Sequence, residues 1–596
     1  MSQQAAGPAA SATVVVLGAG INGAALAREL LLSGVSVAVV DAGDIASGAT
    51  AWSTRLVHGG LRYLEYGEVA LVRESLVERD RLTRLAPHLV KPLEFYLPVE
   101  TRLGGLWAAA ARLVGLESLA RRWRGSRGRG CWTVGIGLTL YDLLSVGSRW
   151  PWHRLVRAGA AGMPQVDAGR FPFAAVYADA QMLFPERFTV ELLVDARRIA
   201  AESAAQTVRP SVMQPAAQFA VFTHHATRLL PDGRLRIEPV GRRRDGATAV
   251  ELQPAAIINA TGAWVDRTLD GLLPGAGERR LIGGTKGSHL VLAAPALRAA
   301  IGDRGVYAEA ADGRPVFVLP FGERLVLVGT TDIPFDGDPA DARTDDDEIT
   351  YLLAAVARIF PAAAADRETV VQHYCGVRPL PSAGQGSGAP GSITRRHMLV
   401  RHPAAGVPSF WSIVGGKLTT CRSLAEAAAA EVLGCLGLPV LATSRERPLP
   451  GSCAGPACAT AESAAAMHAE AAGLPVDRAR RVAHATVAVF GSRGPEICAA
   501  MRPADAADRL LIHGTDLPLA AVWFCVREEW AVSLDDLIER RLMLAFDAGL
   551  TRAAIEEVAE ALVQMEMLPR ELLAEEVAAC IGRLRERCGK IVDSGV

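Results

Sequence analysis

A short segment near the N-terminus combines residue types suited to binding an anion. Residues 53–65 read STRLVHGGLRYLE, in which His58, Gly59 and Gly60 form a turn and Arg62 and Tyr63 follow. Glycine lets the backbone approach a ligand closely. A phosphate monoester is a dianion that favours planar bidentate guanidinium partners. The pattern therefore predicts a site where bare backbone lies beside fixed positive charge.

A glycine-rich loop precedes this segment. Gly18, Gly20 and Gly23 fit G-x-G-x-x-G, after the β-branched run at 13–17, and Asp41 ends the next predicted strand. Such a strand, loop and helix binds a pyrophosphate at the helix N-terminus, and the acid accepts hydrogen bonds from ribose hydroxyls. An acid here disfavours a 2′-phosphate, so NADP is not expected. The loop alone leaves NAD and FAD open.

Two later segments again predict a strand that is followed by a turn containing glycine. Residues 255–266, AAIINATGAWVD, end a strand in Ala-Thr-Gly, and 409–434 carry Gly415, Gly416 and Lys417 between a strand and an Ala-rich helix. The first is the type of turn that passes a dinucleotide in two-dinucleotide-binding-domain flavoproteins, and the second places a helix N-terminus where a phosphate or the electron-rich edge of a flavin could lie. Together with the first unit, these turns indicate a discontinuous FAD domain.

Composition narrows the class of protein. The chain has 596 residues, is half apolar and has a formal net charge of −1. The length predicts two or three domains, and the balanced charge argues against a nucleic-acid binder. The ten cysteines show no zinc spacing, so we expect no metal site and idle thiols. The N-terminal residues lack the pattern typical of a signal peptide, and we expect no membrane-spanning helix.

Many long stretches resemble one family, the FAD-dependent glycerol-3-phosphate dehydrogenases, within the glycine/D-amino-acid oxidase-like flavoproteins. They include GAGINGAALA, the run from STRLVHGGLRYLE to FYLPV, INATGAWV, GTKGSHLVL, FVLPFGERLVLVGTTDIPFDGDP, GVRPLPS, SITRRH and VGGKLTT. A late stretch, VREEWAVSLDDLIERRLMLAFDAG, resembles the helical C-terminal domain of this family. The resemblance covers nearly the whole chain.

The resemblance implies non-covalently bound FAD and oxidation of sn-glycerol 3-phosphate to dihydroxyacetone phosphate, with electrons passed to membrane quinone. It assigns the flavin contacts to Gly18, Gly20, Asn22, Gly23, Asp41, Ser53, His58, Gly59, Gly60, Gly262, Gly415, Gly416, Lys417, Leu418 and Thr419. It assigns the substrate phosphate to Arg62, Tyr63, Arg378 and Arg395. It makes His289 the base for the substrate hydroxyl, helped by Arg378 and Lys417.

Three rival functions remain open. An oxidase of the same fold would use dioxygen in place of quinone. An amine or amino-acid oxidase would need one carboxylate-binding arginine and an apolar pocket, whereas this chain offers three arginines and a lysine. A flavin-binding protein without turnover is the third, because residues 179–188 depart from the family: PERF stands where an Asp-Ala-Arg-Leu-type run is usual.

A second departure is an insertion at residues 102–130. It holds seven arginines and one acid, with leucines and Trp107 interleaved. An interfacial helix on anionic lipid and an ordinary surface helix are both compatible with this pattern. The first, with the family resemblance, favours a cytoplasmic protein bound peripherally to the inner face of the plasma membrane. Whether the chain forms a homodimer is left open.

These observations predict an α/β (α+β) protein of three parts. A Rossmann-like two-dinucleotide-binding FAD domain is expected from residues 12–100, 180–270 and 395–440. A β-rich substrate cap is expected from 100–180 and 275–395. An all-α C-terminal domain is expected from 445–596, after the Pro-Gly linker at 448–451.

Overall fold

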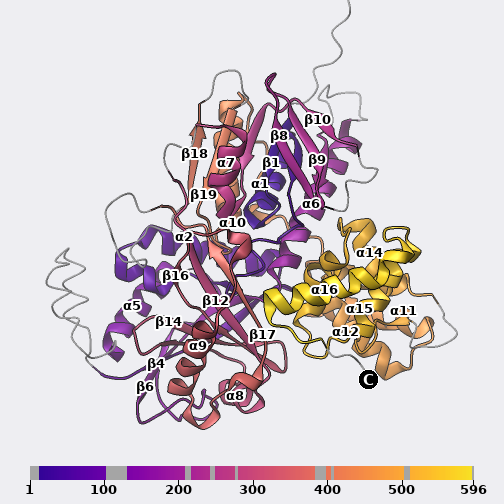
Figure 1. Cartoon of the computed structure of the whole chain (residues 1–596). Helices are drawn as coiled ribbons and strands as arrows, with labels where there is room; N and C mark the ends of the chain where they lie inside the picture. The colour runs from indigo at the N-terminus through magenta and orange to yellow at the C-terminus, as the bar shows by residue number, and fades with distance from the viewer. Residues whose placement is uncertain are drawn as a thin grey trace, which may run out of the picture.

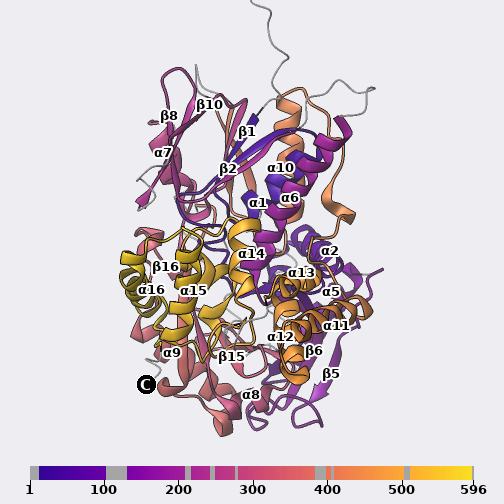
Figure 2. The same cartoon turned by 90° about the vertical axis from the view of Figure 1, so that its right-hand side faces the viewer.

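A computed structural model describes residues 13–102, 130–145, 147–207, 217–241, 248–275, 280–382, 397–403, 409–502 and 510–592. In Figure 1, a six-stranded sheet lies at the top, a ten-stranded sheet lies below it, and the C-terminal helices lie on the right. Figure 2 views the molecule from the side of those helices. The α/β fold expected from the sequence is confirmed.

The six-stranded sheet has the order β18–β19–β11–β1–β2–β7, and every pair is parallel except the edge pair β18–β19. Its strands are β1 (Thr13–Leu17), β2 (Ser36–Val40), β7 (Phe219–Phe222), β11 (Ala256–Asn259), β18 (Met398–His402) and β19 (Ser409–Val414). The strands β1, β2 and β11 are buried except for Thr13 at the start of β1, as expected for a parallel sheet covered on both faces.

Successive side chains of β1 point to opposite faces of the six-stranded sheet and show which elements cover each face. Val14 and Val16 pack with α1 (Ile21–Leu32), α6 (Pro185–Thr207) and α10 (Cys421–Cys435). Val15 and Leu17 pack instead with a three-stranded sheet and α7 (Val265–Leu272). That small sheet consists of β8 (His225–Leu229), β9 (Leu235–Pro239) and β10 (Val250–Leu252).

The ten-stranded sheet carries the second half of the site. Its main order is β16–β12–β15–β14–β13–β4–β6–β3, with β17 paired to β12 and β5 paired to β6. The strands are β3 (Leu56–Val57), β4 (Val90–Val99), β5 (Arg154–Arg157), β6 (Phe173–Met182), β12 (Thr285–Leu292), β13 (Gly305–Glu309), β14 (Pro315–Phe321), β15 (Leu325–Gly329), β16 (Ile333–Pro334) and β17 (Val370–Arg378).

Helices cover both faces of this sheet. One face packs on α8 (Pro295–Ile301) and α9 (Asp346–Ile359), where Asp345 and Glu348 form the capping box expected for an acidic helix start. The other face packs on α2 (Val69–Leu85) and α5 (Cys131–Leu144). Both helices also contact the short 3₁₀ helix at Leu61–Tyr66, which continues the His-Gly-Gly turn.

The C-terminal part is helical. Its α-helices are α11 (Pro456–Ala471), α12 (Val476–Phe490), α13 (Gly494–Ala499), α14 (Ala520–Glu528), α15 (Arg552–Gln564) and α16 (Leu573–Cys588), with a π-helical turn at Asp536–Arg541. Cys453 and Cys458 pair as a disulfide at its start, whereas the sequence predicted idle thiols. Within the described ranges, no helix has the length and apolar character needed to span a bilayer.

Candidate functional site

The glycine loop between β1 and α1 is shaped by backbone contacts that exclude side chains. Gly18 has φ +100°, and a Cβ there would lie 2.7 Å from the carbonyl oxygen of Ala260 at the end of β11. A Cβ on Gly23 would lie 2.0 Å from the carbonyl oxygen of Gly18. Gly20 lies at the N-cap of α1 and supplies no side chain, while the Ile21 N–H of the first turn donates to the Thr50 hydroxyl at 3.1 Å.

Asp41 lies directly behind this loop. One carboxylate oxygen accepts the Ala19 N–H at 2.7 Å, and the other accepts the Gly43 N–H at 2.8 Å. Burial raises the pKa of Asp41, while these two backbone hydrogen bonds act in the opposite direction. The carboxylate thus fixes the loop, and each oxygen still has a lone pair for a ribose hydroxyl.

The second glycine turn meets the first across the sheet. Gly415 and Gly416 follow β19 with φ of +82° and +101°. The Asn22 side-chain N–H₂ donates to the Gly415 carbonyl at 3.5 Å, and a Cβ on Gly416 would lie 2.5 Å from that nitrogen. The other end of the same amide, Asn22 Oδ1, is buried with no hydrogen-bond partner among the described residues. A buried acceptor of this kind fits a bound polar ligand.

The His-Gly-Gly turn is held from α5 and β6. The Gly59 N–H donates to the Tyr141 hydroxyl at 2.9 Å, and the same hydroxyl donates to Asp179 at 2.7 Å. Arg79 pairs with Asp179 at 2.8 Å, so the buried carboxylate is compensated. A Cβ on Gly59 would lie 2.4 Å from the Tyr141 oxygen, which explains the glycine.

The structure brings the residues after this turn together with the second glycine turn. Lys417 Nζ lies 3.8 Å from the centroid of the Tyr63 ring, a cation–π contact. The His58 N–H donates to the Thr419 hydroxyl at 3.1 Å. Arg62 Nε is buried without a hydrogen-bond partner in the described part of the chain. Arg395 lies outside the described residues.

A row of residues across four strands links this turn to His289. Phe317 on β14 stands opposite Gly329 on β15, Gly329 stands opposite His289 on β12, and His289 stands opposite Tyr374 on β17. The Phe317 ring lies 6.5 Å from the ring of His58. A Cβ on Gly329 would lie 2.2 Å from the His289 ring, so the glycine makes room for the imidazole.

His289 is buried and kept neutral by its surroundings. Its Nε2 is 2.9 Å from the Thr54 hydroxyl, and its Nδ1 has no partner among the described residues. Burial, then the positive charges of Arg378 and Arg55, lower the pKa of His289 well below its ordinary value. The imidazole is therefore uncharged at neutral pH and can accept a proton.

The guanidinium of Arg378 lies on the same side of the sheet. It donates to Asp332 at 3.0 Å, to the Thr330 hydroxyl at 2.9 Å and to the Thr331 carbonyl at 3.2 Å. The side chain is one-quarter exposed. The arginine is thus held in one orientation while it remains accessible to an anion.

The two charged side chains of residues 185–188, PERF, form buried ion pairs and do not line the site. Glu186 forms a bidentate pair with Arg55 at 2.6 and 2.9 Å. Arg187 forms a bidentate pair with Glu529 of the C-terminal part at 2.5 and 2.8 Å. All four side chains are fully buried. Arg55, which stands just before the His-Gly-Gly turn, is therefore an interior residue whose charge is balanced by a carboxylate 131 residues away in the chain.

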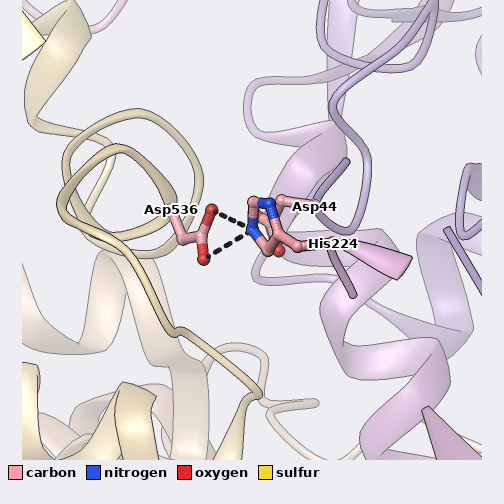
Figure 3. A group of neighbouring side chains, drawn as sticks. All are labelled: Asp44, His224 and Asp536. Atoms are coloured by element: carbon pink, nitrogen blue, oxygen red, sulfur yellow. Dashed lines mark hydrogen bonds and ion pairs between the residues drawn. The ribbon is translucent and has the colours of Figure 1, made fainter. Parts of the chain in front are cut away.

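A second cluster joins the FAD-binding part to the C-terminal part. Asp44, His224 and Asp536 bring one ligand atom each within 4.8 Å of one another (Figure 3). Arg540 and Arg541 already pair with Asp44 at 2.6 and 2.8 Å, so both acids are compensated without a cation. The cluster holds two parts of the protein together through these ion pairs and the contact between His224 and Asp536 at 3.2 Å.

Sequence reasoning missed three polar residues of this region: Thr54, Tyr141 and Tyr374. For Tyr374, the sequence contains a pattern that could have indicated its position. Tyr374 and Arg378 lie four residues apart on β17, so alternation places them on the same face. Tyr141 gave no signal, because its partners Gly59 and Asp179 are distant in sequence.

The parallel sheet, the two glycine turns and the buried neutral histidine define a dinucleotide-dependent oxidoreductase. Comparison with known proteins gives the family. Residues 13–429 match the family described as "FAD dependent oxidoreductase", and residues 442–566 match the "C-terminal domain of alpha-glycerophosphate oxidase". The chain belongs to the FAD-dependent glycerol-3-phosphate dehydrogenase family, and FAD is its cofactor.

Individual relatives extend over most of the chain. It is 34% identical to glycerol-3-phosphate dehydrogenase of Synechocystis sp. over 89% of this chain and 88% of that one. It is 31% identical to aerobic glycerol-3-phosphate dehydrogenase of Escherichia coli over 69% and 72%, and 29% identical to D-erythritol 1-phosphate dehydrogenase of Brucella abortus over 88% and 93%. The fold matches glycerol-3-phosphate dehydrogenase from Bacillus halodurans, solved with FAD, with a TM-score of 0.69 and 19% identity over 97% and 95%.

Proposed function

We propose that this protein oxidises sn-glycerol 3-phosphate to dihydroxyacetone phosphate. The observation that carries the proposal is the neutral, buried His289 beside the fixed cation Arg378. A secondary alcohol that carries a phosphate needs both a proton acceptor and an anion-binding group. The names of the relatives supply the substrate, because they are dehydrogenases of glycerol 3-phosphate and of a related polyol phosphate.

The phosphate would be bound by Arg62, Arg378 and Arg395, with Tyr63 beside them. The orientation of Arg378 supports this role, since Asp332 and Thr330 restrict its guanidinium before any ligand arrives. Binding an anion to a preorganised fork loses little side-chain entropy. Holding the phosphate also fixes the position of C2 relative to His289.

His289 would take the hydroxyl proton. Its pKa is low in the free protein because Arg378 and Arg55 add positive charge to a buried ring. A bound phosphate dianion opposes that charge, so substrate raises the basicity of the imidazole at the moment it is needed. Arg378 and Lys417 would stabilise the developing alkoxide. Bound FAD supplies the hydride acceptor.

The cofactor contacts follow from the two glycine turns and the His-Gly-Gly turn. Bare backbone and Asp41 would take the adenosine diphosphate, and the amide of Asn22 would pair through its buried oxygen. The full set that we assign to FAD is Gly18, Gly20, Asn22, Gly23, Asp41, Ser53, His58, Gly59, Gly60, Gly262, Gly415, Gly416, Lys417, Leu418 and Thr419.

We assign membrane quinone as the electron acceptor and a peripheral position on the inner face of the plasma membrane. The exposed apolar face of α5, described below, supports this assignment. The segment 102–130, for which the sequence left an interfacial helix and an ordinary surface helix open, lies largely outside the described residues. Dioxygen as acceptor would make the protein an oxidase.

An anaerobic titration with sn-glycerol 3-phosphate, following the visible absorbance of the flavin, tests the reaction. Bleaching is expected, and re-oxidation by a quinone analogue much faster than by air would support the acceptor. Fast re-oxidation by air with peroxide release would make the protein an oxidase. A spectrum that stays oxidised with glycerol 3-phosphate but bleaches with D-erythritol 1-phosphate would overturn the substrate and keep the chemistry.

A further inference from the structure

The outer face of α5 is apolar along its whole length. Every third or fourth residue of this helix is a large apolar side chain in contact with solvent: Trp132, Ile136, Leu140 and Leu143. Trp132, Ile136 and Leu143 are each more than half exposed, at 59, 58 and 53%. Thr139 is the one remaining exposed side chain of α5, and no charged side chain is fully exposed on this helix.

Two more apolar residues extend this surface. Trp152 is 58% exposed, and Leu155 on β5 is 45% exposed. Leu155 lies beside α5, because a Cβ on Gly135 would be 3.5 Å from its side chain. We call Trp132, Ile136, Leu140, Leu143, Trp152 and Leu155 the α5 surface. An apolar patch of this kind on a folded protein marks an interaction site.

The charges around the α5 surface favour an anionic partner. Residues 131–157 contain three arginines, Arg149, Arg154 and Arg157, and one acid, Asp142. Arg154 is paired with Glu94 of β4 at 2.8 Å, so the exposed Arg149 and Arg157 supply the positive charge beside the α5 surface. Asp142 is half-buried and hydrogen-bonded to His153 at 2.7 Å, so it contributes little negative charge to the surface.

The opposite face of α5 is fixed to the protein. Val134 and Leu138 pack in the core of the ten-stranded sheet, and the Tyr141 hydroxyl accepts the Gly59 N–H of the flavin-side turn. The start of the helix is held because the Cys131 N–H donates to the Thr101 carbonyl at 2.8 Å. In Figure 1, α5 lies at the left edge of the molecule, opposite the C-terminal helices. The α5 surface is therefore a rigid, outward-facing part of the fold.

We infer that the α5 surface is the contact with a bilayer that contains anionic lipid. Two tryptophans and an aliphatic stripe insert at the level of the headgroups, and arginines at the margin pair with phosphates. The inference deepens the proposed function, on which its biological meaning depends, because a quinone acceptor resides in the membrane. It places the membrane contact on α5, whereas the sequence offered residues 102–130 for that contact.

Flotation of the full-length holoenzyme with vesicles tests this inference. The vesicles contain phosphatidylcholine alone or with about one-third phosphatidylglycerol, since the electrostatic part requires anionic lipid. Wild-type protein is expected to float with the anionic vesicles. The double variant Ile136→Glu, Leu143→Glu is expected to bind at least about tenfold more weakly, because two charges replace inserted apolar side chains.

A matched control and a separate activity assay keep the outcomes distinct. Met467→Glu changes a 70% exposed apolar residue on α11 and should bind vesicles like wild type. Equal binding by the double variant, which keeps all seven arginines, would overturn the inference. The inference would also be overturned if the wild-type protein does not float and instead forms a dimer that the double variant dissociates. Turnover of glycerol 3-phosphate with a water-soluble quinone analogue, without vesicles, tests the proposed function independently and should be unchanged in the double variant.

Discussion

The imidazole of His289 stacks on the phenol ring of Tyr374, with ring centroids 4.9 Å apart and planes inclined by 22°. Tyr374 is itself fixed, because its hydroxyl donates to the Ser53 carbonyl at 3.1 Å and Phe546 of the C-terminal part packs edge-on against it at 6.2 Å. Burial raises the pKa of Tyr374 to about 12, so the phenol stays protonated. The orientation of the histidine thus depends on three separate segments of the chain.

Replacing Tyr374 should separate the stacking contact from the hydroxyl contact. Tyr374→Phe keeps the ring and should change the rate of flavin reduction by less than about threefold. Tyr374→Ala removes the ring and should slow reduction by roughly tenfold or more, because the imidazole is no longer held in one position. Anaerobic stopped-flow with glycerol 3-phosphate measures both. Phe219→Ala, which removes a ring packed edge-on against Trp530 on the edge strand of the six-stranded sheet, is the control. Equal rates in Tyr374→Ala and wild type would refute the positioning role.

Arg378→Ala should lower kcat/KM well over tenfold. A charge-assisted hydrogen bond contributes roughly 1.5–3 kcal/mol, and this arginine is expected to make such bonds with the phosphate. The control is Arg358→Ala on α9, since Arg358 is similarly exposed, at 28%, and pairs with Glu100 at 2.7 Å away from the site. Steady-state kinetics with a soluble quinone analogue distinguishes the two. Wild-type kinetics in Arg378→Ala would remove this residue from the site.

Local rules were enough for the parts of the site built from neighbouring residues. The loop at Gly18 to Gly23, the strand that ends at Asp41 and the turn at Gly415 follow from period, spacing and glycine chemistry. The sheet then brings Asn22 and Gly415 together, as two turns at the carboxyl ends of parallel strands must do. The division into three domains at the predicted boundaries stays a prediction.

Those rules could not predict ion pairs between residues that are far apart in the sequence. Glu186 and Arg187 are adjacent in sequence, yet they pair with Arg55 and Glu529, which lie 131 and 342 residues away. No local pattern indicates which buried acid will meet which buried base. The sequence could mark residues 179–188 as unusual and connected them with a possible loss of turnover, whereas in the structure Glu186 and Arg187 make interior contacts that anchor α6.

The Arg55–Glu186 pair gives a stability prediction. Glu186→Gln leaves a charged guanidinium buried without its carboxylate, so it should lower the free energy of unfolding by about 3–5 kcal/mol. Asp312→Asn breaks the exposed pair with Arg314 and should cost less than about 1 kcal/mol. Urea unfolding followed by tryptophan fluorescence measures both. Equal midpoints for the two variants would show that the buried pair does not stabilise the fold.

The contact between His224 and Asp536 should make the junction between the FAD-binding and C-terminal parts sensitive to pH (Figure 3). Burial lowers the pKa of His224, but the hydrogen bond and charge of Asp536, with the charge of Asp44, outweigh it, and the net pKa is raised. A histidine with a raised folded-state pKa stabilises fully below its unfolded value, near pH 6.5, and loses that contribution as pH rises through the folded value. The lowered pKa of Asp536 acts only under strongly acidic conditions.

His224→Asn tests this dependence, since asparagine tolerates the positive φ of 58° at this position. Between about pH 6 and about pH 9, the thermal midpoint of the wild-type holoenzyme should fall more than that of the variant. The difference should be largest at the acidic end, where the imidazolium pairs with Asp536. Parallel curves for the two proteins would mean that His224 is uncharged in the folded state and that Arg540 and Arg541 alone hold Asp44 at this junction.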